Sequence, residues 1–209
     1  MNFKKLSSQV GLFGLCLSLL LLSGCAHYRA RPLQKLPATI RQSSEQTVSF
    51  EYHALDRSDC KDYLDRNVQA KGYQPIQLTI ENNSLRFLYF SLSSFDIPCI
   101  SANEVASTVH TSTVGRAVGY TVAGLVTFIW LLFIPAIVDG IGSDKANEQL
   151  DIDFARKAMH NQTIAPNSTI NGLIFVPYEN FNDNFSFSLA DHEKNEHFKL
   201  STVKRSIKI

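Results

Sequence analysis

Apolar and polar residues alternate with a period of two in three stretches of the chain, residues 47–54, 76–81 and 185–189. Successive side chains of a β-strand point to opposite faces of a sheet, so this period predicts strands that are buried on one face. The continuous apolar run 173–176 predicts a further strand that is buried on both faces. We therefore expect a mainly β fold.

The predicted strands form two sets, three before residues 117–138 and three or four after them. The turn Asn-Asn-Ser at 82–84 is predicted to join residues 76–81 to residues 85–92 as a hairpin. Neither set can bury both faces of a sheet by itself. We therefore expect the two sets to pack together as one β-sandwich over residues 47–204.

Between the two sets, residues 117–138 carry no formal charge and are predominantly apolar. Gly115 and Gly119 match the G-x-x-x-G pattern of closely packed membrane helices. Trp130 is of the type that anchors a helix at a membrane interface, although a core position is the alternative. Pro135 is expected to kink or end the helix. Small residues recur at every fourth position and make one helix face: Gly115, Gly119, Ala123 and Thr127.

Three interpretations of this apolar segment remain open. In the first, a loop at 139–142 and an amphipathic helix at about 144–159 complete a helical hairpin, which packs on the sandwich or dips into a membrane. In the second, the small-residue face mediates self-association, and in the third the segment spans a membrane once. A single span would separate the two strand sets, so we prefer the hairpin, inserted at about 105–160. The fold is then α+β overall.

The first 25 residues have three zones. Residues 4–5 are lysines, residues 10–22 are apolar, and Leu-Ser-Gly-Cys at 22–25 closes the run. This order is typical of a secretory signal, and the apolar core is shorter than the ~20 residues that a spanning helix needs. The last four residues resemble the lipobox of bacterial lipoproteins. The resemblance implies that residues 1–24 are a signal peptide that is removed.

The same resemblance implies diacylglycerol on the Cys25 thiol and a fatty acyl group such as palmitate on its new amino terminus. Two or more such chains give stable membrane attachment. In this family an Asp after the lipidated Cys favours the inner membrane. Because that residue is Ala26 here, we expect a location in the cell envelope at the outer membrane. Residues 25–46 are polar and irregular, which predicts a flexible tether.

Two cysteines remain after the signal peptide and the lipidated residue, Cys60 and Cys99. Disulfides persist outside the cytoplasm. Pairing these two would contribute roughly 4 kcal/mol in the chain-entropy model. We expect a Cys60–Cys99 disulfide, with two separate buried thiols as the alternative.

The sequence contains no pattern of a catalytic, metal or cofactor site. The stretch His-Glu-Lys-Asn-Glu-His at 192–197 has one residue too many between its histidines for a zinc-protease motif, which needs them at i and i+4 of a helix. The formal net charge of +1 gives no electrostatic footprint for nucleic acid. We expect no enzyme activity, no cofactor, no metal and no nucleic-acid partner.

Two parts of the sequence resemble secreted immunoglobulin-like families. Residues 77–84 with the aromatic strand after them are similar to an early hairpin of these families, and residues 164–166 and 172–176 to a later strand entered after a proline. The resemblance implies an immunoglobulin-like sandwich and leaves the function open. We expect an envelope-anchored structural or protein-interaction module, with residues 117–138 contacting a partner, a second copy or lipid. The alternative is a binding module for a small apolar ligand or lipid.

Overall fold

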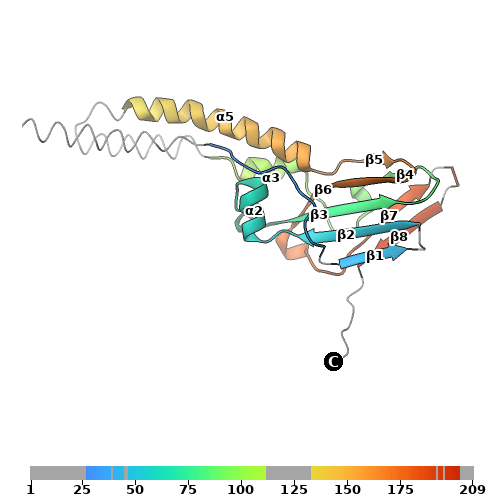
Figure 1. Cartoon of the computed structure of the whole chain (residues 1–209). Coiled ribbons are helices and arrows are strands. Elements are labelled where there is room, and N and C mark those ends of the chain that lie inside the picture. Colours follow the sequence, from blue (N-terminus) through green and yellow to red (C-terminus); the bar gives the residue numbers. More distant parts are fainter. Residues whose placement is uncertain are drawn as a thin grey trace, which may run out of the picture. The chain divides into compact units, whose positions relative to one another are not determined.

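The computed structural model describes the following residues (Figure 1): 27–38, 40–44, 47–111, 133–191, 193–194 and 196–202. The chain divides into two compact units. Unit 1 comprises residues 1–28 and 110–150, and unit 2 comprises residues 29–109 and 151–209.

Within its described residues, unit 2 contains two four-stranded antiparallel sheets, so the expectation of a mainly β fold is confirmed. Sheet A has the order β1-β2-β3-β6, with bounds Ile40–Ser44, Val48–Ala54, Tyr73–Asn82 and Ser168–Pro177. Sheet B has the order β5-β4-β7-β8, with bounds Gln162–Ile164, Leu88–Phe90, Ser186–Asp191 and Glu196–Ser201. Two α-helices lie between strands, α2 (Arg57–Leu64) and α3 (Ala102–Thr108). Single 3-10 turns occur at Gln69–Lys71, Leu92–Ser94 and Tyr178–Asn180.

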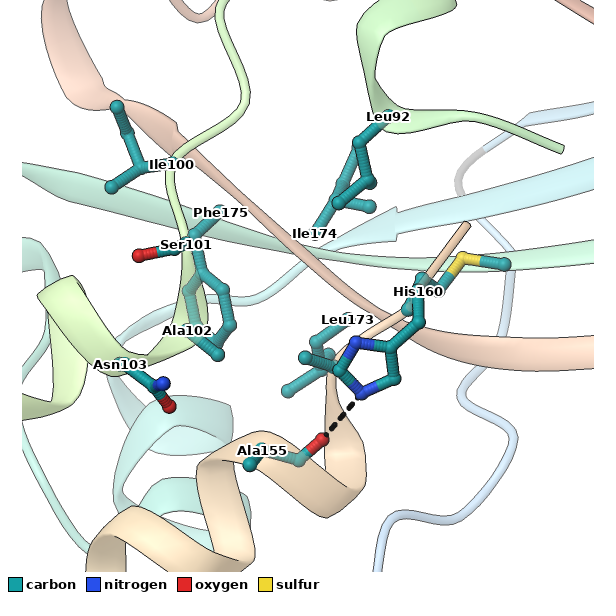
Figure 2. Close-up of a pocket in the computed structure, with 12 residues that line it drawn as sticks. Leu92, Ile100, Ser101, Ala102, Asn103, Ala155, His160, Leu173, Ile174 and Phe175 are labelled. Carbon is teal, nitrogen blue, oxygen red and sulfur yellow. Dashed lines mark hydrogen bonds between the residues drawn. The ribbon is translucent and has the colours of Figure 1, made fainter. Parts of the chain in front are cut away.

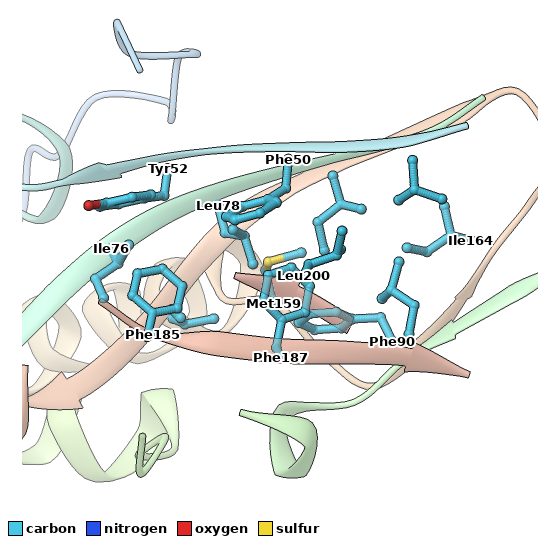
Figure 3. Close-up of a cluster of buried hydrophobic side chains, with 14 of the residues drawn as sticks. Phe50, Tyr52, Ile76, Leu78, Phe90, Met159, Ile164, Phe185, Phe187 and Leu200 are labelled. Carbon is cyan, nitrogen blue, oxygen red and sulfur yellow. The ribbon is translucent and has the colours of Figure 1, made fainter. Parts of the chain in front are cut away.

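The inner faces of the two sheets share one hydrophobic core, in which the aromatic side chains of the alternating strands meet (Figure 3). Phe50 of β2 meets Phe187 of β7 edge to face, with 5.2 Å between ring centroids. Tyr52 of β2 and Phe185, which directly precedes β7, repeat this contact with 5.1 Å between ring centroids. The arrangement is compatible with a β-sandwich.

The two strand sets of the sequence share one sheet. β3 pairs with β6 along its whole length, from Tyr73 opposite Pro177 to Asn82 opposite Ser168. These strands precede and follow residues 117–138. A single membrane crossing between them is therefore incompatible with the sheet, and that interpretation is wrong.

The predicted hairpin of residues 76–81 and 85–92 is also wrong, because β3 and β4 belong to different sheets. The cause is the fully buried side chain of Asn82. Its amide nitrogen donates to the carbonyl oxygens of Arg86 at 2.8 Å and of Ala165 at 3.0 Å. These bonds hold the connection in a path that crosses from sheet A to sheet B.

α2 begins with a capping box. The Asp56 side chain accepts hydrogen bonds from the backbone N–H groups of Ser58 and Asp59, and the Asp59 side chain accepts from the Asp56 N–H. Two of the unpaired donors of the first turn are thereby satisfied. The helix ends at Asp65, which has the left-handed backbone conformation with φ of 50°.

Much of the predicted tether, residues 25–46, lies against sheet A. β1 lies within it and pairs with β2. Upstream, the backbone N–H of Leu36 donates to Gln77 Oε1 at 2.9 Å, and Gln77 Nε2 donates to the Gln34 carbonyl at 2.8 Å. Gln77 alternates with core residues along β3, so its side chain is on the face away from the core. Residues 29–38, which we call the strap, therefore cover part of the outer face of sheet A.

Charged groups add to the docking of the strap. The Lys35 ammonium lies 3.0 Å from a Glu51 carboxylate oxygen and 3.6 Å from one of Glu81. The hydrogen bond to Glu51 raises the pKa of Lys35 above its ordinary value. Nδ1 of His53 donates to the Pro37 carbonyl at 2.9 Å. The polar composition of residues 25–46 predicted a free linker. Instead, polar groups of the strap form hydrogen bonds and ion pairs with polar side chains on the outer face of sheet A.

α5 (Phe133–Lys157) begins in unit 1 and ends in unit 2. It continues through residues 139–142, so the loop that the sequence predicts there is wrong, because an interior glycine costs a helix only about 1 kcal/mol relative to alanine. Pro135 lies within α5, so the helix does not end at this residue, and a kink there stays a prediction. In unit 1 the Asn147 side chain bonds both backbone groups of Thr111, at 2.9 Å and 3.2 Å.

Residues 1–26 and 112–132 lie outside the described residues. The lipobox with Cys25, the first helix of the predicted hairpin, and the small-residue and aromatic positions Gly115, Gly119, Ala123, Thr127 and Trp130 all fall there. Among the residues that the structure describes, no helix combines the length and the apolar character that a bilayer crossing requires.

Candidate functional site

A pocket of about 230 Å³ lies in unit 2 beside β6 (Figure 2). The start of α3 and the residues that end and follow α5 form its walls, and β6 contributes one side. The lining is mainly apolar, and it comprises Leu92, Ile100, Ser101, Ala102, Asn103, Ala155, Ala158, Met159, His160, Leu173, Ile174 and Phe175.

Two backbone contacts create the pocket by covering the outer edge of β6. The N–H of Ile100 donates to the Phe175 carbonyl at 2.8 Å, and the N–H of Met159 donates to the Leu173 carbonyl at 2.8 Å. Each contact is an isolated bridge and neither extends into a strand. The edge of sheet A is thus protected from pairing with another chain, and a gap between the two covering segments remains.

Three polar side chains line the pocket, Ser101, Asn103 and His160. Nε2 of His160 lies 2.9 Å from the Ala155 carbonyl. A carbonyl oxygen only accepts, so Nε2 carries a proton, and in the uncharged form of an imidazole the other ring nitrogen, here Nδ1, is an acceptor. The Ser101 hydroxyl accepts from the Glu104 N–H as the N-cap of α3. These polar groups suit the orientation of a small molecule, and no nucleophile–base pair is among them.

A shallower depression of about 600 Å³ adjoins this pocket and shares Leu92 and His160 with it. Its remaining lining consists of Ser93, Phe95, Ile97, Pro98, Cys99 and Asn161. The Asn161 side chain accepts a hydrogen bond from the Leu92 N–H at 2.8 Å, which fixes the boundary between the two hollows.

The predicted Cys60–Cys99 disulfide is absent, because both residues are free thiols. Cys60 is fully buried on the inner face of α2 with Leu64, whereas Cys99 lies in the loop before α3 and lines the shallow depression. Burial raises the pKa of the Cys99 thiol to about 12, and burial together with the nearby Asp59 and Asp56 carboxylates raises the pKa of Cys60 to about 12. Both thiols are therefore protonated at neutral pH, which argues against a nucleophilic role.

A buried lysine joins α5 to α2. Nζ of Lys157 lies 2.5 Å from a carboxylate oxygen of Asp153 and donates to the Tyr63 carbonyl at 2.6 Å. Lys157 is only 7% exposed. A buried ammonium needs such partners to offset its desolvation, so we assign the cluster a structural role.

In the described part of the chain, no three His, Cys, Asp or Glu side chains gather as metal ligands would. The described residues of the stretch 192–197 belong to the β7–β8 turn and the start of β8, and they are exposed to solvent. They do not lie on a helix, which a zinc-protease motif would need. Sequence patterns did not indicate the pocket, because its lining comes from loops and element ends without periodicity.

Comparison of the chain with protein-family models, with curated proteins and with solved structures gives no match in any of the three.

Proposed function

We propose that the protein is an envelope-anchored lipoprotein whose β domain acts as a structural or protein-interaction module. The observation that carries this proposal is Leu-Ser-Gly-Cys at 22–25, after two lysines and an apolar run. Cys25 carries the lipid, and Ala26 directs the protein to the outer membrane. Residues 117–138 form a second contact, with lipid, with a partner or with another copy, through Gly115, Gly119, Ala123, Thr127 and Trp130.

We propose further that the domain is immunoglobulin-like. The seven strands β2 to β8 can be given the immunoglobulin strand letters A to G in chain order. The first sheet, β1-β2-β3-β6, then holds strands A, B and E, and the second sheet, β5-β4-β7-β8, holds strands D, C, F and G in that spatial order. Strands A, B and E share a sheet in immunoglobulin folds, and C, F and G share the other. The fourth strand lies beside C, as the C′ strand of variable-type domains does. α3 and α5 lie in the chain between these two strands.

Exposed apolar side chains on the β3–β4 connection support an interaction role. Leu85 is 87% exposed and Phe87 is 53% exposed. Arg86 between them is fixed by ion pairs to Glu196 at 2.9 Å and Asp191 at 3.3 Å. Fixing Arg86 holds the two neighbouring apolar groups in solvent, where a protein partner can bury them.

Cys25→Ser tests the anchor. We expect no incorporation of labelled palmitate and a larger precursor that keeps residues 1–24, because serine lacks the thiol that receives diacylglycerol. Cys16→Ser is the matched control, since Cys16 lies in the signal peptide itself, and it should mature normally. Labelling and electrophoretic mobility in the producing bacterium give the readout. Normal maturation of Cys25→Ser would falsify the lipoprotein assignment.

A second candidate function, binding of a small apolar ligand, is favoured by the 230 Å³ pocket. Apolar cavities of roughly 150 Å³ bind benzene in other proteins. The lining of this pocket is mainly apolar, and an uncharged His160 ring supplies an acceptor for one polar group of a ligand.

We expect benzene to shift the amide resonances of Leu173 and Phe175, and Ala155→Phe to abolish the shifts by filling the pocket. Arg156→Phe is the control, because this exposed neighbour lies on the same helix and does not line the pocket. Saturation of amide shifts in heteronuclear NMR measures the affinity. Equal shifts in wild type and Ala155→Phe would remove the pocket as the binding site.

A further inference from the structure

The chain passes between unit 2 and the rest of the sequence at three points. It enters at Arg29, leaves after Val109 and returns at Asp151. The residues beyond these points include the lipidation site at one end and the apolar segment 117–138 between the other two. Where the three points lie on unit 2 decides which face of the domain meets the membrane.

Two of the three points belong to one hydrogen-bonded cluster at the end of α2. Asp65 Oδ2 accepts from the backbone N–H of Arg29 at 3.1 Å and from Nη1 of Arg66 at 3.0 Å. Nε of the same Arg66 donates to the Val109 carbonyl at 3.2 Å. The entry of the strap and the exit toward the apolar segment are therefore held together by two consecutive residues.

The third point is tied to the same helix end through Lys157. Its ammonium donates to the Tyr63 carbonyl, which precedes Asp65 by two residues, and pairs with Asp153, which follows Asp151 by two. The side-chain carboxylate of Asp62 also pairs with the strap residue Arg31 at 3.1 Å. All three chain crossings are thus fixed around residues 62–66 of α2 and its C-cap.

We propose that this end of unit 2, the α2 end formed by residues 57–66 and strap residues 29–31, rests on the phospholipid surface that holds Cys25. The inference rests on the proposed lipid anchor. Arg29 follows Cys25 by four positions, so the chain between them spans at most about 14 Å even when fully extended. A flexible tether through residue 46 would have allowed any face of the domain to approach the membrane, but the docked strap does not.

The charges of the α2 end suit anionic headgroups. Arg29, Arg31, Arg57 and Lys61 are exposed. The carboxylate of Asp62 pairs with Arg31, and that of Asp65 pairs with Arg66. Basic side chains close to a membrane are attracted by anionic lipid, and the internal pairing of these carboxylates reduces the opposing repulsion.

Fluorescence quenching measures which end of unit 2 faces lipid. The lipidated protein is reconstituted in vesicles of phosphatidylethanolamine and phosphatidylglycerol that carry a nitroxide on some headgroups. In a Cys99→Ala background, one variant carries a fluorophore at Lys61→Cys, and the matched variant carries it at Asn83→Cys. Both positions are exposed. Asn83 follows the far end of ten-residue β3, about 30 Å from the α2 end.

We expect the nitroxide to quench the Lys61→Cys probe several-fold more than the Asn83→Cys probe. Equal quenching, or stronger quenching at Asn83→Cys, overturns the assignment of the α2 end while palmitate on Cys25 still supports the lipoprotein. Absence of palmitate from Cys25 overturns both proposals. Labelling and quenching are measured on the same preparation, so the two failures are distinguishable.

Discussion

Phe187→Ala is expected to lower the free energy of unfolding by about 4 kcal/mol, as large-to-small changes of a buried aromatic residue do. Phe187 is 1% exposed and lies between the two sheets. Its ring stacks on Phe95 with 4.7 Å between centroids, and meets the edge of Phe50 at 5.2 Å and of Phe90 at 6.3 Å. Alanine leaves a cavity that the paired strands cannot close by moving together.

Phe87→Ala is the matched control, since it removes the same atoms from a side chain that is 53% exposed. We expect a change within about 0.5 kcal/mol, the usual range for surface positions. Urea unfolding, followed by the far-UV circular dichroism of the backbone, gives both free energies. Similar losses for the two variants would mean that the aromatic cluster of Figure 3 is not the core of the domain.

The sequence predicts best the strands that bury one face in the core and turn the other face away from it. β2 (Val48–Ala54) and β7 (Ser186–Asp191) lie within one or two residues of the expected positions, because their alternation records burial on one face. β5 (Gln162–Ile164) escaped prediction, since three residues are too few to show a period. β1 escaped because its polar residues sit in a polar, proline-containing stretch.

The pairing of strands depends on contacts that no local pattern carries. The sequence Asn-Asn-Ser at 82–84 is a sound turn signal, yet the strands on either side enter different sheets. The strap illustrates the same limit, because its partner Gln77 lies about forty residues downstream and alternates like any solvent-facing residue. The pocket beside β6 combines segments near residues 100, 160 and 174, which only the fold brings together.

Asn82→Ala is expected to cost about 3 kcal/mol, because it leaves several buried polar groups without partners. The amide nitrogen donates to the carbonyl oxygens of Arg86, Ile164 and Ala165. The amide oxygen accepts from both the backbone N–H and the hydroxyl of Ser84, at 3.1 Å and 2.6 Å. One side chain thus joins the β3–β4 connection to the segment between β5 and β6.

Asn82→Asp separates hydrogen bonding from shape. Aspartate fills the same volume and still accepts from Ser84, but a carboxylate donates nothing to the three carbonyl oxygens and places a buried negative charge beside them. We therefore expect Asn82→Asp to be at least as destabilising as Asn82→Ala at neutral pH, and less so in acid, where the protonated carboxyl donates one bond. Asn83→Ala is the control, since its side chain is exposed. Urea unfolding at two pH values measures all three variants, and a neutral Asn82→Ala would show that the crossing between the sheets does not depend on this amide.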